Sequence, residues 1–328
     1  MIWIRIKYKF QILTNLFLFK IGFANFLLKN RYGEQILVFH GIDRIGEIKY
    51  NSRFHSESFF SEFINYINKN YNIISLKDYY NKKFQPNTLN IAITFDDGYL
   101  NNYKYAISVL EKNNIPATFF ITAVQEMQPF LWPDFLDLVS YYSFKKEIIF
   151  ENKRYKKNKK NEFVNNGVSL KNECKKLPFH KIELLFSIFK EEWKTIQDKN
   201  LDDYWQLMSI EEIKKISRNH LFTIGSHSLT HSNLASISIE EAKSEILKGK
   251  IYIENICNRS ISEFAFPFGS YNSELVDFCK EIGLSKILLL DYNCEEDKKN
   301  NSLKNRFVMN PHISLENQLS FLLKGKYI

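Results

Sequence analysis

Two pairs of side chains that can bind metal or transfer protons follow directly after short apolar runs in this sequence of 328 residues. Asp96 and Asp97 follow one run, and His227 and His231 follow another. Barrel and doubly wound α/β enzymes carry their active sites at the carboxyl ends of strands, so both pairs are candidates for one site. Two neutral imidazoles with one carboxylate suit a catalytic zinc ion, and a second carboxylate can act as a base.

Each pair also has an ordinary explanation when it is considered alone. Asp-Asp-Gly is a common turn sequence, and two histidines can be polar residues of a loop or a helix start. The i, i+4 spacing of His227 and His231 places both rings on one face of a helical turn. The combination carries more weight than either pair, because the chemistry requires both and both occur at predicted strand ends.

Candidate substrate-binding residues surround a third turn. A Phe-Pro-Phe-Gly sequence after another apolar run offers aromatic surface on a backbone turn that can form one wall of a sugar groove. A tryptophan further upstream can stack on a sugar ring or anchor the segment that follows it to the core. The candidate substrate-binding residues are His40, Trp132, Pro267, Phe268 and Gly269.

The elements that must position these residues alternate between strands and helices. Short apolar runs that end in turn residues predict strands, and several of them are separated by patterns of helical period. The predicted strands are 36–39, 91–95, 117–121, 222–226, 263–267, 286–290 and 306–309. The predicted helices are 58–68, 101–112, 239–255 and 273–282. This alternation predicts an α/β protein with a parallel sheet or barrel.

The alternation stops between about residues 129 and 207. This stretch is rich in Lys and Asn and is partly helical, with a helical apolar spacing over residues 183–194. We interpret it as an insertion in a single domain that covers residues 36–328. An insertion between two barrel strands lies at one rim, where it can build or cover a substrate cleft.

Residues 1–35 form an apolar and basic segment with predicted helical structure. Arg5, Lys7, Lys9 and Lys20 interrupt it before an uncharged run reaches the ~18 residues that a spanning helix needs. The segment lacks the long apolar core and the cleavage site of a secretory signal. A helix packed on the domain, a basic helix at a membrane surface and an uncleaved signal anchor stay open. We therefore expect a protein of the cytoplasm or of the periphery of the cytoplasmic membrane.

Charge and cysteine content bear on partners and compartment. The net charge of +8 is partly local, but the Lys/Arg cluster at 153–160 lacks the aromatic interleaving of an RNA-binding strand, so we expect no nucleic-acid partner. The four cysteines contain no C-x-x-C pair, which argues against a disulfide scaffold and favours a reducing compartment. The G-x-S-x-G, phosphate-loop and G-x-G-x-x-G signatures of other enzyme classes are not found.

Three motifs in this order resemble those of a known enzyme family. T-F-D-D-G, H-S-x-x-H and the P-F-G turn are similar to the motifs of polysaccharide deacetylases, the NodB-homology or carbohydrate esterase family 4 domain. The resemblance covers roughly residues 36–314, and V-F-H-G at 38–41 resembles the opening strand of one extracytoplasmic-type branch. It implies a distorted (β/α) barrel with a long, partly helical insertion, and metal-dependent removal of acetyl groups from amino sugars.

The resemblance implies a role for each matching residue. Asp96 becomes the general base, and Asp97, His227 and His231 become the ligands of a divalent metal ion. Zinc is the expected ion, and cobalt or nickel can occupy the same ligands. The ion would polarise the acetyl carbonyl and activate a water, Asp96 would take the proton, and a backbone N–H near Phe268 would hold the developing oxyanion.

Two positions depart from the family pattern. Ala265 stands where the family often has an Arg that orients the base; Arg306 is the candidate replacement, and an ordinary surface Arg is the alternative. The family supplies a late His as general acid, for which His312 is the candidate and His40 its rival, with a buried structural His as the alternative for either.

Other functional classes stay open. A catalytically weakened, glycan-binding module would account for both departures, and turnover rather than bound metal separates it from an enzyme. Binding to nucleic acid or anionic lipid is supported by charge alone and would collapse with added salt. A polymer, a lipid-linked saccharide and a small sugar, with an N- or O-linked acetyl group, are all candidate substrates.

Overall fold

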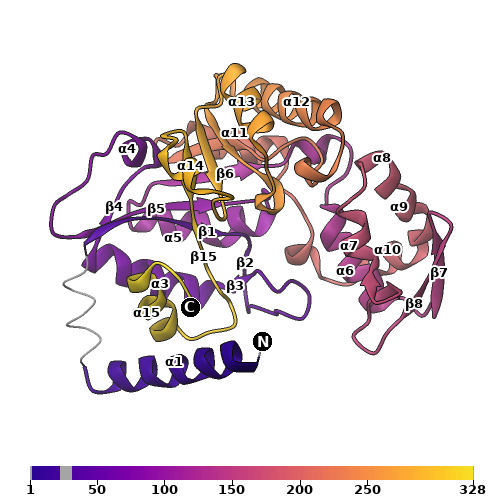
Figure 1. The fold of residues 1–328 in the computed structure, drawn as a ribbon, viewed down its shortest axis with the longest axis horizontal. Coiled ribbons are helices and arrows are strands. Elements are labelled where there is room, and N and C mark those ends of the chain that lie inside the picture. Colours follow the sequence, from indigo (N-terminus) through magenta and orange to yellow (C-terminus); the bar gives the residue numbers. More distant parts are fainter. Residues whose placement is uncertain (1, 23–31, 328) are drawn as a thin grey trace.

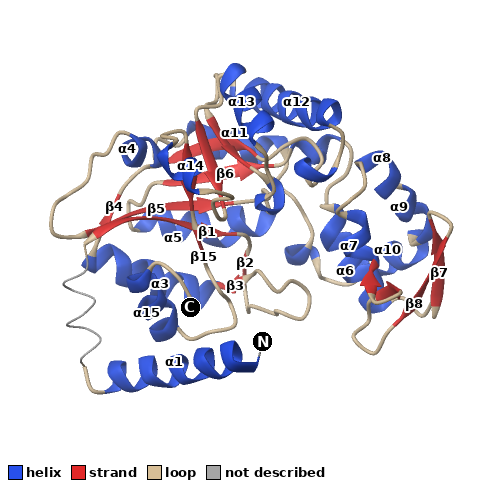
Figure 2. Cartoon of the chain, viewed as in Figure 1, coloured by secondary structure: helices blue, strands red, loops and turns tan. Residues whose placement is uncertain are grey.

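A parallel sheet forms the centre of the molecule in the computed structural model, which describes residues 2–22 and 32–327 (Figures 1 and 2). Its strands lie in the order β14-β13-β12-β11-β6-β5-β1-β15, and the short β4 (Asn72–Ile73) pairs with β5. The strands of this path are β1 Gly33–Phe39, β5 Leu89–Phe95, β6 Ala117–Ile121, β11 Phe222–Ser226, β12 Glu263–Ala265, β13 Lys286–Leu289, β14 Leu303–Asn305 and β15 Phe307–Val308.

The chain itself brings the two edges of this sheet together. β14 pairs with β13, β15 pairs with β1, and Arg306 alone separates β14 from β15. The segment 303–308 therefore joins both edges into a nearly closed, distorted (β/α) barrel. This closure places Arg306 between the first and the last strands of the sheet.

Helices cover the sheet and keep its strands away from water. β5 is buried along its whole length, as is typical of parallel strands that have helices on both faces. Serines cap several of these helices, and Ser209 and Ser238 form capping boxes with Glu212 and Glu241. The helices around the barrel are α3 Glu57–Asn70, α4 Leu76–Tyr80, η1 Asn102–Ala106, α5 Ile107–Lys112, α11 Ile210–Arg218, α12 Ile239–Cys257, α13 Ser273–Glu281, α14 Glu295–Lys299 and α15 Leu315–Lys324.

The predicted strands and helices are confirmed, with small shifts at their ends. The helix predicted over 101–112 begins with the π-helical turn η1 before it continues as α5. The largest difference lies near residues 303–309, where the prediction gave one strand and the structure has two on opposite edges of the sheet. The sequence does not show that residues 303–305 form a strand of their own, because Leu303 is the only apolar residue among these three.

Residues 132–204 form a lobe at one end of the molecule (Figure 1). Its helices are α6 Trp132–Tyr142, α7 Leu170–Cys174, α8 Phe179–Ile182, α9 Leu184–Ile188 and α10 Lys190–Gln197. Its antiparallel sheet is β7 Glu147–Phe150, β8 Lys153–Lys157, β9 Phe163–Asn165 and β10 Val168–Ser169. The sequence did not predict this sheet, because β8 buries Tyr155 alone and its apolar pattern is too sparse.

The lobe has a cluster of buried apolar side chains that is separate from the core of the barrel. Phe54 and Tyr99, which belong to the barrel, are part of this second cluster and pack edge to face with ring centroids 4.7 Å apart. Tyr99 follows the Asp-Asp-Gly turn, so the lobe is packed onto the barrel beside that turn.

The helix α1 (Ile2–Lys20) lies against α15 on the outside of the barrel (Figure 1). The rings of Tyr8 and Phe321 stack at 5.7 Å, and Asn15 Nδ2 donates to Asn317 Oδ1 at 3.2 Å. Residues 23–31 of the predicted N-terminal segment lie outside the described residues. None of the helices in the described part of the chain has the length and apolar character to cross a membrane.

Candidate active site

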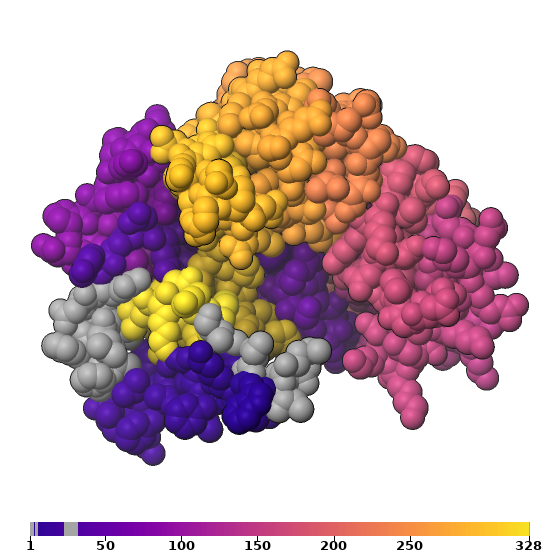
Figure 3. All heavy atoms as spheres, viewed as in Figure 1, coloured from indigo at the N-terminus to yellow at the C-terminus, as the bar shows by residue number. Residues whose placement is uncertain are grey.

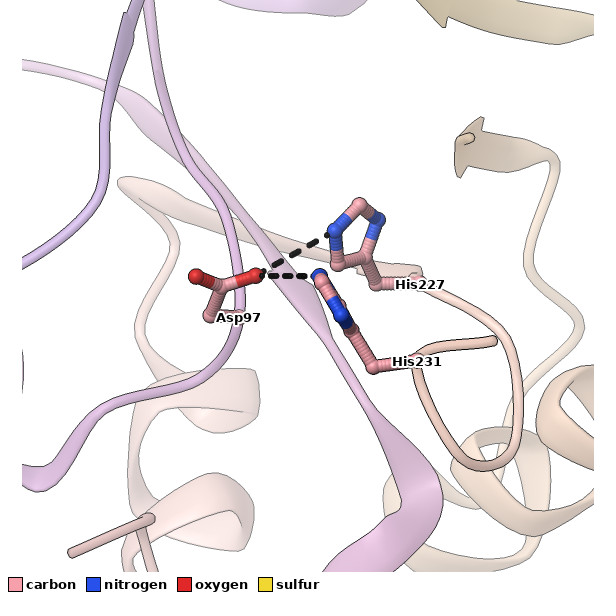
Figure 4. Close-up of side chains that lie close together, drawn as sticks. All are labelled: Asp97, His227 and His231. Carbon is pink, nitrogen blue, oxygen red and sulfur yellow. Dashed lines mark ion pairs between the residues drawn. The ribbon is translucent and has the colours of Figure 1, made fainter. Parts of the chain in front are cut away.

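Asp97, His227 and His231 form a buried cluster at the carboxyl ends of β5 and β11 (Figure 4). Asp97 Oδ1 lies 3.3 Å from His227 Nε2 and 3.1 Å from His231 Nε2. One ligand atom from each residue lies within 4.8 Å of the others. Their positions after two strands predicted this pairing, and the structure brings them together across β6, which lies between β5 and β11.

The arrangement of donors and lone pairs in this cluster fits a metal ion. His227 Nδ1 lies 2.7 Å from the carbonyl oxygen of Ala265, and a carbonyl only accepts, so Nδ1 carries the proton. Nε2 is the ring nitrogen that faces Asp97 Oδ1, at 3.3 Å, and it is the atom available to a metal ion. This buried oxygen has no donor in hydrogen-bonding geometry among the described residues. A cation between these three atoms would satisfy all of them, so the cluster could hold a metal ion.

The loop between the two histidines is held by the helix α12. Thr230 donates to the buried carboxylate of Glu245 from its backbone N–H at 2.8 Å and from its hydroxyl at 2.6 Å. Gly249 lies against the loop so closely that a Cβ there would come within 2.5 Å of the Ser228 carbonyl carbon. The glycine therefore lets the helix approach the loop, and Glu245 fixes the loop in place.

The second aspartate of the pair is held by Arg306. Arg306 donates from Nη1 to Asp96 Oδ1 at 2.6 Å and from Nη2 to Asp96 Oδ2 at 2.7 Å. Its Nε donates to the Leu289 carbonyl at 3.3 Å, and its side chain is fully buried. Burial by itself would raise the pKa of Asp96, but Arg306 and His227 hold that pKa below its usual range. Arg306 was predicted to replace the base-orienting Arg of the family, whose position Ala265 occupies in this chain. The structure shows the predicted contact between Arg306 and Asp96.

A guanidinium that the sequence analysis missed holds the other oxygen of Asp97. Arg53 donates from Nη1 to Asp97 Oδ2 at 2.9 Å, and from Nη2 to Asp134 Oδ1 at 2.9 Å and to Tyr99 Oη at 2.7 Å. The Tyr99 hydroxyl in turn donates to Asp134 Oδ2 at 2.5 Å. Burial by itself would raise the pKa of Asp97, but Arg53 and His231 hold it well below its usual range. Arg53 therefore joins the metal-ligand candidate to the insertion lobe.

The signals for this network in the sequence are weak. Tyr99 directly follows Asp-Asp-Gly, and Asp134 follows a Trp-Pro pair at the start of a helix. Burial raises the pKa of Asp134 to about 6. Arg53 lies in a loop without periodicity, so only the folded chain brings it to the two aspartates.

The two candidate acid histidines line one cavity of about 280 Å³ beside Arg53. His40 is half-buried, and its pKa is lowered to about 4 by burial and by Arg53, whereas the charges of Asp97 and Asp96 act in the opposite direction. His312 is exposed, and its backbone N–H donates to Asn310 Oδ1 at 2.9 Å. His40 is therefore the histidine that interacts electrostatically with both aspartates.

The aromatic residues near the cluster correct part of the substrate-binding prediction. Trp132 is fully buried, and its Nε1 donates to the His231 carbonyl at 3.1 Å. A sugar ring needs an exposed aromatic face, so Trp132 anchors the insertion lobe instead of stacking on substrate. Pro267 is buried as well. Phe268 and Gly269 are half-buried, and the Phe268 ring packs edge-on against His231 at 4.6 Å.

Comparison with known proteins assigns the family. The family model for polysaccharide deacetylase matches residues 85–173 and 189–287, more than half of the chain. The chain therefore belongs to the polysaccharide deacetylase family. No curated protein matches it in sequence.

Solved structures share the barrel. One is the deacetylase PplD of Streptococcus pyogenes in complex with acetate, with a TM-score of 0.57, 14% identity, and coverage of 88% of this chain and 98% of that chain. Another is IcaB from Ammonifex degensii, with a TM-score of 0.55, 15% identity and coverage of 90% and 98%. A putative polysaccharide deacetylase of Bacillus anthracis has a TM-score of 0.53, 17% identity and coverage of 88% and 68%. At such identities the similarity shows the fold.

Proposed function

We propose that the protein is a metal-dependent hydrolase that removes acetyl groups from N-acetylated amino sugars of a polysaccharide or a saccharide precursor. The observation that carries this proposal is the buried Asp97–His227–His231 cluster beside an aspartate held by Arg306. Membership of the polysaccharide deacetylase family supports the class of reaction.

The proposed chemistry divides the site into two parts. A divalent ion held by Asp97, His227 and His231, with zinc expected and cobalt or nickel as alternatives, would supply a Lewis acid and an activated water. Asp96 accepts the proton of the attacking water. The two-point contact with Arg306 fixes the plane of the Asp96 carboxylate and leaves its other lone pairs for that proton. The turn at Phe268 supplies a backbone N–H for the developing oxyanion.

The leaving amine needs a proton, for which we propose His40 in place of His312. The charges of Asp96 and Asp97 act on His40, whereas His312 is exposed to solvent. Burial lowers the pKa of His40 to about 4, so His40 must first take up a proton before it can pass one to the leaving amine. The proton that Asp96 removes from the water is the proposed source, which keeps the proton count balanced.

A catalytically weakened glycan-binding module was the alternative, because the base-orienting Arg and the late acid His both depart from the family pattern. The first of these two reasons no longer holds. Ala265 leaves the usual position of the base-orienting Arg empty, but the Arg306 guanidinium contacts both oxygens of Asp96. The base is therefore supported by a residue that lies between β14 and β15.

We expect the purified protein to hold one divalent ion and to release acetate from N-acetylated glycans. Acetate release from a panel of N- and O-acetylated polymers, lipid-linked saccharides and small sugars, measured with and without chelator, tests this function. The His227→Ala, His231→Ala double variant should lose both metal and turnover, because two of three ligands are removed. Absence of acetate release by folded, metal-loaded protein, or full metal occupancy in the double variant, would refute the proposal.

We also expect Arg53→Ala to weaken metal binding by about 10–100-fold, the usual effect of removing a group that supports a ligand. The variant leaves Asp97 and Asp134 buried without their shared cation. A competition titration with a metal-binding dye measures the affinity, and Arg44→Ala, which removes an exposed arginine nearby, is the matched control. Unchanged metal affinity in Arg53→Ala would show that Asp97 needs no support from Arg53.

A further inference from the structure

The helix α1 uses one face to pack on the barrel. Tyr8, Ile12, Leu18 and Phe19 contact the barrel core from this helix. Asn15 is almost fully buried and bonds to Asn317 of α15. The helix is therefore fixed in orientation, with a defined face toward the protein and a defined face away from it.

The opposite face of α1 is apolar and exposed. The exposed fractions are 82% for Trp3, 52% for Ile6, 72% for Phe10, 65% for Leu13 and 60% for Phe17. At 100° per residue, these five side chains fall within an arc of about 80°. We call them the α1 stripe. The helix α1 itself is the indigo segment at the bottom of Figure 3, beside the yellow C-terminal helix.

Packing on the barrel does not explain the α1 stripe. The inner face already supplies the contacts with α15, so large aromatic residues on the outer face gain nothing from folding. Contiguous exposed apolar surface of this kind marks an interaction site. Trp3 and Phe10 are among the most exposed large apolar side chains in the described part of the chain.

The charges around the stripe identify the partner. Lys7 lies about 40° beyond one edge of the stripe and Lys9 about 40° beyond the other, with Lys20 close to Lys9. All three are exposed, and α1 contains no acidic residue. An apolar stripe with one lysine on one side and two on the other suits a helix that lies in the plane of an anionic membrane surface.

We propose that α1 binds an anionic lipid surface, with the α1 stripe inserted at the acyl boundary and Lys7, Lys9 and Lys20 against the phosphate headgroups. A second copy of this chain fits less well. The lysines that border the stripe would repel those of a copy, whereas they attract an anionic surface. The proposal is independent of the deacetylase function.

Sedimentation of the full chain with vesicles tests this binding. We expect binding to phosphatidylcholine vesicles that contain phosphatidylglycerol, and at least about tenfold weaker binding to phosphatidylcholine alone, since each lysine contributes roughly fivefold. The Trp3 emission should shift to the blue on binding. Trp132, Trp193 and Trp205 are buried, so the shift reports on α1.

Two variants and one control separate the contributions. The Trp3→Ser, Phe10→Ser, Phe17→Ser variant should lose at least about tenfold in affinity, and Lys7→Gln, Lys9→Gln should lose on the order of tenfold. Phe144→Ser, which removes a fully exposed ring from the insertion lobe, should bind like the wild type.

Equal binding to neutral and anionic vesicles would overturn the proposal, as would a triple variant that binds as tightly as the wild type. The proposal would also be wrong if the protein does not bind vesicles and instead forms a dimer through the α1 stripe. Circular dichroism and metal content of each variant confirm the fold, so failure of vesicle binding is distinct from failure of the proposed enzyme activity.

Discussion

Asp96→Asn is expected to abolish acetate release while metal stays bound, whereas Asp97→Asn is expected to lose both. Of these two aspartates, Asp97 is the one that contributes an oxygen to the cluster with His227 and His231. Asp96 bonds to Arg306 instead, so its proposed role is to accept a proton. Loss of a general base lowers turnover by about 10²–10⁴-fold. Single-turnover acetate release and metal analysis on the same samples separate the two effects.

A matched control removes a charge without touching the site. Asp277→Asn changes an exposed aspartate of α13 and should leave metal content and turnover at wild-type values. Near wild-type turnover in Asp96→Asn, or equal loss of metal in both site variants, would show that the division of labour between the two aspartates is wrong.

Arg306→Ala is expected to lower kcat by about 10²–10³-fold with little change in metal content, because the base loses its orientation and its stabilising charge. Without Arg306, burial dominates and raises the pKa of Asp96. A base must be ionised to act, so the acidic limb of the kcat profile should move to higher pH. The unpaired buried carboxylate should also reduce the free energy of unfolding by about 3–5 kcal/mol.

Arg306→Lys provides a test if the alanine variant does not fold. Lysine keeps the charge but cannot contact both carboxylate oxygens in a plane, so kcat should recover only in part. Arg218→Ala, at an exposed position on α11, is the control. If kcat of folded Arg306→Ala stays within about threefold of wild type, Arg306 has a structural role alone.

Much of the barrel and half of the site could be predicted from the sequence, because they depend on local features. Apolar runs bounded by turn residues mark β5, β6 and β11 whatever the rest of the chain does. The residue after a parallel strand always emerges at the same edge of the sheet, so Asp97 and His227 could be placed together without a structure.

Only the tertiary structure decided which distant side chains complete the site. Arg306 reaches Asp96 across 210 residues because the closing segment of the barrel passes between β13 and β1. Arg53 reaches Asp97 and Asp134 from a loop, and burial excludes Trp132 from contact with substrate. Such contacts depend on where the chain returns in space, and local preferences of backbone and side chain carry no information about that.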